Sequence, residues 1–283
     1  MAGLGFGFFV TTAATVVLDT AAPRARGRLM GAYLLVGDAG SVLGAGVGGW
    51  IYERFGTHVP FFVKAVCAAT AALAARRTKG AVALEERAER AGVRQVIRVA
   101  GLLPISSVNM VLFMADVGIL AILFPLFLRD RGLAPGLIGV FVALVVSIQL
   151  AALALGSRLA DRWGRVRFLS LGLMLYSAGL VLLSATSTNP GIVFSTLVLG
   201  VGSGTARAVP AALVGDLAAT HVRGTAMGIF RTFTDIGMIA GPAFLGALAA
   251  QSGYGAAFGA TAGLLAAGVV LLFLTHRALN HVS

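Results

Sequence analysis

The chain alternates between long apolar stretches and short polar clusters. Nine stretches approach the roughly 20 residues that a helix needs to cross a hydrocarbon core about 30 Å thick. They cover residues 2–18, 29–51, 59–75, 102–128, 133–156, 168–186, 191–217, 225–250 and 255–275. Only residues 76–100 form a long polar segment, whose spacing predicts a short amphipathic helix on the membrane surface. The pattern predicts an all-α, polytopic transmembrane bundle of about nine spans.

Composition and charge support a membrane protein. The chain is 58% hydrophobic and only 12% charged, whereas a soluble domain is usually about 25% charged. The net charge of +11 comes from Lys and Arg clusters in alternate loops, as expected for the cytoplasmic side of a membrane and not for a nucleic-acid-binding surface. We therefore expect a multi-pass protein of the cell membrane or cell inner membrane, with the N-terminus of this chain outside and its C-terminus in the cytoplasm.

An internal repeat relates the second stretch to the eighth. An ungapped offset of 197 residues superposes Asp38 on Asp235 and Arg26 on Arg223. Both stretches then cross in the same direction, which predicts a parallel repeat of six-span units. We expect a partial first bundle at 1–75, equivalent to spans 4–6, a cytoplasmic linker at 76–101, and a second bundle at 102–283, equivalent to spans 7–12. By this count, about three spans are missing before Met1.

The loop after the fifth stretch carries a recognisable motif. The run from Ser157 to Arg167 resembles the G-x-x-x-D-R-x-G-R signature of the major facilitator superfamily of transporters. Its matching residues are Asp161, Arg162, Gly164 and Arg165. The resemblance implies that fold, lacking about three N-terminal helices. It also implies a conformational latch, in which Asp161 approaches Arg28 and Leu29 while Arg165 approaches Asp216.

Glycines recur at helical spacing in both copies of the repeat. Small residues allow helices in lipid to approach closely. The first set resembles the G-x8-G-x3-G-P-x2-G-G pattern of proton-coupled antiporters in the same superfamily, with Ala45 in place of the proline. The expected helix-packing residues are Gly31, Gly40, Gly44, Gly48, Gly49, Gly237, Gly241 and Pro242.

Polar and ionisable residues inside the apolar stretches are candidates for function. A charge at mid-bilayer costs at least roughly 2.5 to 3.5 kcal/mol, so it faces a cavity or a partner. The candidates for proton coupling or solute binding are Asp38, Asp116, Asp235, Arg231, Arg207, Asn109 and Gln149. Arg231 and Asp235 are four residues apart and could simply neutralise each other. We expect Asp38 or Asp235 to carry a coupled proton.

These observations favour a secondary active transporter that exports a small organic solute or drug in exchange for protons by alternating access. A sugar or metabolite uniporter or symporter is an alternative, as is a non-transporting fragment that needs the missing spans. No metal spacing, nucleophile triad or phosphate loop is present, so we expect no enzyme, no cofactor and no metal. The expected partners are the lipid bilayer, a small-molecule substrate and protons, with the chain acting as a monomer.

Overall fold

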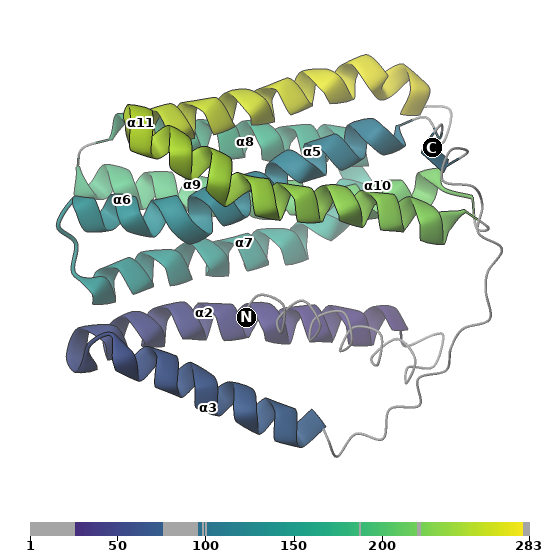
Figure 1. Cartoon of the computed structure of the whole chain (residues 1–283). Helices are drawn as coiled ribbons and strands as arrows, with labels where there is room; N and C mark the ends of the chain where they lie inside the picture. The colour runs from purple at the N-terminus through teal and green to yellow at the C-terminus, as the bar shows by residue number, and fades with distance from the viewer. Residues whose placement is uncertain are drawn as a thin grey trace.

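The computed structural model (Figure 1) describes residues 26–75, 96–97, 99, 101–186, 188–219 and 222–279. Every regular element in these ranges is helical, which confirms the predicted all-α class. The predicted span 2–18 and most of the predicted linker lie outside the described residues. Among those that are described, five helices are long and apolar enough to cross a membrane, and His58–Ala71 is a shorter apolar helix. The five are Leu102–Asp130, Pro135–Gly156, Arg165–Ala185, Asn189–Leu217 and Arg223–Thr275.

The helices follow the predicted spans closely. Their bounds are α2 Arg26–Phe55, α3 His58–Ala75, α5 Leu102–Ala115, η1 Asp116–Leu123, α6 Phe124–Asp130, α7 Pro135–Trp163, α8 Arg165–Ala185, α9 Asn189–Arg207, α10 Pro210–Leu217 and α11 Arg223–Leu279. The elements α5, η1 and α6 run on from one another as one long rod. In Figure 1 the helices of the 102–279 segment lie side by side, and α2 lies along α7 with α3 beyond it.

The sequence repeat is visible in where the helices break. Helix α2 ends just before Gly56, whose φ is 77°. The offset of 197 residues leads from Gly56 to Gly253, where α11 breaks with a φ of 83°. Glycine adopts such positive φ angles without the clash that a Cβ brings. Both copies therefore turn at the same glycine, which divides α11 into two rods. Through Pro242, in contrast, the backbone of α11 keeps helical dihedral angles.

Three glycines of α9 let it sit close to two neighbouring helices. A Cβ at Gly202 would overlap the backbone of Tyr176 on α8, and one at Gly204 would overlap the carbonyl oxygen of Gln149 on α7. A Cβ at Gly200 would lie 2.7 Å from the Cβ of Ile148, also on α7. Such backbone approach is how helices associate in lipid. It also fixes the position of Arg207 at the C-terminal end of α9.

Helix α2 touches α7 near the turn that contains Gly56. A Cβ at Gly49 would lie 2.8 Å from the carbonyl oxygen of Pro135, and the Glu53 carboxylate accepts a 2.9 Å hydrogen bond from the backbone nitrogen of Gly136. A carboxylate is favourable at a helix N-terminus because unpaired N–H groups point outward there. A Cβ on the expected packing residues Gly40, Gly44 and Gly48 would meet nothing within 4 Å. Among the described glycines expected to pack in the first copy of the repeat, Gly49 is therefore the one in close contact with another helix. The surroundings of Gly31 are not described.

Candidate functional site

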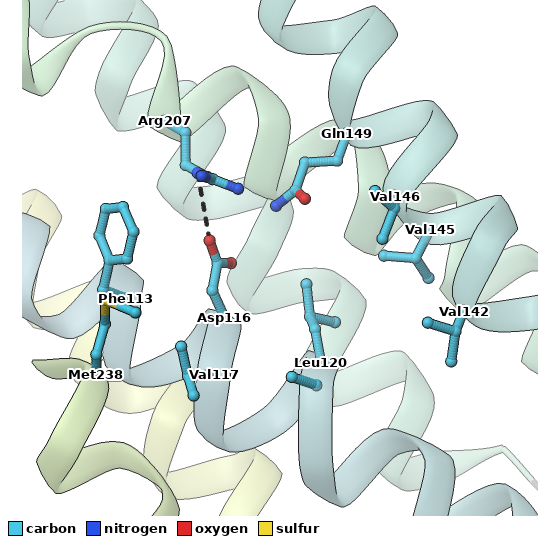
Figure 2. A pocket seen from close by; sticks show the side chains of 11 residues that line it. Phe113, Asp116, Val117, Leu120, Val142, Val145, Val146, Gln149, Arg207 and Met238 are labelled. Carbon is cyan, nitrogen blue, oxygen red and sulfur yellow. Dashed lines mark ion pairs between the residues drawn. The ribbon is translucent and has the colours of Figure 1, made fainter. Parts of the chain in front are cut away.

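A cavity of about 410 Å³ lies among α5, η1, α7, α9 and α11 (Figure 2). This volume falls in the range of small-molecule sites, roughly 300 to 1,000 Å³. Most of its wall is apolar, and three polar side chains project into it. The lining residues are Phe113, Asp116, Val117, Leu120, Ala121, Val142, Val145, Val146, Gln149, Arg207 and Met238.

Asp116 and Arg207 form an ion pair at the polar end of this cavity. The Asp116 Oδ2 atom lies 3.4 Å from Arg207 Nε, and the two side chains are 11% and 28% exposed. The Tyr176 hydroxyl donates a 3.1 Å hydrogen bond to Asp116 Oδ1, and the Arg207 guanidinium lies 5.2 Å from the centroid of the Phe113 ring. Opposite charges and a tyrosine donor together offset part of the cost of placing Asp116 among apolar helices.

Asp116 stands where the α-helix widens into a π-helix. The segment η1 begins at Asp116, and the N–H of Phe124 bonds to the carbonyl oxygen of Ile119, five residues earlier. The next residue, Pro125, has no N–H and cannot donate to the carbonyl four residues before it. Wide turns of this kind are frequent at functional sites. Here the wide turn follows Asp116 directly and carries Val117, Leu120 and Ala121 to the cavity wall.

The two predicted amides have different surroundings. Gln149 lines the cavity and is only 7% exposed, yet its Nε2 atom has no hydrogen-bond partner. Asn109 is not among the residues that line the cavity, and it donates a 2.7 Å hydrogen bond from Nδ2 to the Thr234 hydroxyl. This bond joins α5 to α11, so the structure places Asn109 in helix packing and Gln149 at the candidate site.

The other predicted charges lie away from this cavity. Arg231 Nε contacts Asp235 Oδ1 at 3.1 Å within α11, and the two side chains are 58% and 51% exposed. Neither of them lines the cavity, whereas Met238 of the same helix does. Asp38 lies on α2, and its side-chain surroundings are not described. The structure therefore groups Asp116, Arg207 and Gln149, and it separates them from Arg231 and Asp235.

The loop motif forms a cluster of charges where α7 meets α8. Gly164, with a φ of 88°, separates the two helices. Arg165 contacts Asp161 at 3.2 Å and also pairs with Asp216 on α10. The predicted contact between Arg165 and Asp216 is thus present, and its role as a conformational latch stays a prediction. Arg162 is exposed. The predicted approach of Asp161 to Arg28 and Leu29 involves side chains whose surroundings are not described.

If the cluster works as the latch that the loop motif implies, replacing Arg165 by glutamine should slow solute transport more than it destabilises the fold. The cluster is largely exposed, and such ion pairs contribute only about 0 to 1 kcal/mol to folding. Losing both contacts should nevertheless change the balance between transport states and reduce the initial transport rate several-fold. Thermal unfolding and initial-rate assays on the same preparation measure both effects. Arg167→Gln, an exposed arginine on the same helix, is the matched control. Equal rates for the two variants would contradict a latch.

Comparisons with known proteins agree with this architecture. The family model described as Major Facilitator Superfamily matches residues 1–114 and 106–282. An uncharacterized MFS-type transporter of Methanocaldococcus jannaschii is 25% identical over 253 residues, 86% of this chain and 65% of that protein. The quinolone resistance protein NorA of Staphylococcus aureus is 24% identical over 144 residues, 51% of this chain and 37% of NorA.

A solved structure of a peptide transporter, POT, in complex with alafosfalin has a TM-score of 0.47 at 17% identity. The match covers 65% of this chain and 38% of that chain. The present chain spans less than two thirds of the length of each of these relatives.

Proposed function

Because the chain belongs to the major facilitator superfamily, we propose that it works as a secondary transporter that moves a small organic solute through the cavity at Asp116 and Arg207. The observation that carries this proposal is an ion pair facing a cavity inside a mostly apolar bundle. Ionisable groups in spans are costly, and they mark solute and ion pathways for that reason. Alternating access would expose this cavity first to one side of the membrane and then to the other.

We further propose that transport is efflux coupled to protons. A carboxylate in a closed apolar cavity favours its neutral form, whereas contact with water or a cation favours the ionised form. Asp116 has both kinds of surroundings: its side chain is only 11% exposed, and the Arg207 cation lies next to it. A proton could therefore bind when the solute has left and be released when the solute or Arg207 takes its place. Asp38 and Asp235 stay proposed as further proton carriers. Similarity to a quinolone resistance protein supports export as the direction.

Inside-out vesicles from cells that express the chain would test this function. With an acidic interior, we expect a fluorescent quinolone to accumulate above the level of vesicles from cells with an empty vector. An ionophore that collapses the pH gradient should abolish the difference. A broader panel of small organic solutes guards against a wrong choice of probe. If no solute accumulates in response to the gradient, proton-coupled efflux is wrong for this chain.

A further inference from the structure

The polar end of the cavity contains a buried hydrogen-bond donor without a partner among the described residues. The Nε2 atom of Gln149 is buried without a partner, and Figure 2 shows this amide turned toward Arg207 and Asp116. Arg207, toward which this amide turns, pairs with Asp116 through Nε at 3.4 Å, and its side chain is 28% exposed. A buried donor is costly to leave unpaired. An amide donor next to a guanidinium is complementary to a planar acceptor such as a carboxylate.

The same end also offers an unused acceptor. Asp116 Oδ1 accepts from Tyr176, but the buried Oδ2 atom accepts no hydrogen bond, since its 3.4 Å approach to Arg207 lacks the required geometry. An ionised carboxylate has about four acceptor positions. The position at Oδ2 therefore suits a donor, and a charged ammonium is the strongest donor it could receive.

Charge balance then restricts the solute. When Asp116 is ionised, it and Arg207 together carry no net charge, and a solute with a net charge would leave an excess charge inside the bundle. Such a charge is costly unless it is paired. A solute with one positive and one negative group can satisfy Arg207, Gln149 and Asp116 at the same time and keep the cavity neutral.

The two protein charges also lie close together. Asp116 Oδ2 and Arg207 Nε are only 3.4 Å apart, so a solute whose ammonium and carboxylate are attached to the same carbon can reach both. The rest of the wall is apolar, formed by Leu120 and the valines of α7 among others. We propose, building on the transport function above, that the cavity binds apolar zwitterions with an amino-acid-like head group, the carboxylate on Arg207 and Gln149 and the ammonium on Asp116.

Three related probes distinguish this proposal from its alternatives. Phenylalanine carries both charges, phenylalanine amide carries only the positive one, and N-acetylphenylalanine carries only the negative one. Equilibrium binding of each is measured to the purified full chain in nanodiscs, without a pH gradient. Each missing charge removes a charge-assisted hydrogen bond, so phenylalanine should bind at least about tenfold more tightly than either derivative. If a singly charged derivative binds equally well or better, or if none binds, the proposal is wrong.

Variants assign each charge to its partner. Gln149→Leu should weaken phenylalanine and N-acetylphenylalanine while leaving phenylalanine amide unchanged. Asp116→Asn should weaken phenylalanine and phenylalanine amide instead. Ser147→Ala is the matched control, because Ser147 is exposed on the same helix and donates to the Ala143 carbonyl. If Asp116→Asn does not fold, the effects of Gln149→Leu on the binding of the three probes still test the proposal. Uniform weakening of all three probes by Gln149→Leu would count against the assigned contacts.

The binding assay and the vesicle assay test the solute class and the proton-coupled efflux independently. A preference for phenylalanine in nanodiscs, with no gradient-driven accumulation in vesicles, would support the proposed solute class and overturn proton-coupled efflux. Gradient-driven export of a quinolone without a preference for the zwitterion would support efflux and overturn the solute class.

Discussion

Gly237→Val will destabilise the bundle strongly, because it forces α11 away from α5. A Cβ at Gly237 would overlap the carbonyl oxygen of Met110, and one at Gly241 would lie 2.5 Å from that of Met114. Backbone atoms cannot move aside as a flexible side chain can. Overpacking usually costs about 1 to 3 kcal/mol, and a clash with backbone belongs at the upper end of that range. Thermal unfolding of the purified chain in detergent should show a clear fall in the transition temperature.

Gly228→Val provides the control on the same helix. A Cβ at Gly228 would meet nothing within 4 Å, so this substitution changes helix propensity and side-chain size without a clash. Its transition temperature should stay close to that of the parent chain. If the two valine variants lose equal stability, the glycines of α11 matter for helix propensity and not for close packing.

The apolar pattern of the sequence predicted the all-helical class and most helix bounds. The offset that matches Asp38 with Asp235 also matches the breaks at Gly56 and Gly253. These features depend on local chemistry, since hydrophobic length sets a span and a glycine sets a turn with positive φ. The contact of Arg165 with Asp216 was also predictable, because a short loop motif fixes one partner and the repeat points to the other.

The candidate site was only partly predictable. Asp116, Arg207 and Gln149 stand out in the sequence as polar residues in apolar stretches. No periodic pattern, however, shows that Asp116 on η1 meets Arg207 at the end of α9, or that Tyr176 on α8 donates to Asp116. That grouping depends on how closely three helices pack, which the glycines of α9 permit but do not specify. Asn109, like Gln149, is an amide in an apolar stretch, yet it donates a hydrogen bond to the Thr234 hydroxyl.

The π-helical turn was missed for a related reason. Pro125 indicates that one backbone hydrogen bond is lost, but a proline in an apolar helix is compatible with a kink, a tightened turn or a widened one. In the structure the turn before it is widened, over Asp116–Leu123. Gly118 within this turn lies against the backbone of Gly241, so packing against α11 accompanies the wide form.

Arg207→Gln should destabilise the chain more than any other single change of charge described here. It would leave Asp116 buried among apolar side chains without its cation, and breaking a buried pair from one side costs about 3 to 5 kcal/mol. The Arg207 side chain is 28% exposed, which places the expected loss at the lower end of that range. The matching loss for Arg231→Gln should be within about 1 kcal/mol, because Arg231 and Asp235 are both half exposed.

The double variant Asp116→Asn with Arg207→Gln separates stability from transport. Removing both charges leaves no uncompensated ion, so most of the lost stability should return. Transport should not return, because the groups proposed to hold the solute and the proton are both gone. The cycle is completed by measuring thermal unfolding and vesicle accumulation for Asp116→Asn, Arg207→Gln and the double variant. If the double variant regains gradient-driven transport along with its stability, the ion pair serves only to hold α9 against η1, and the solute pathway must lie elsewhere in the bundle.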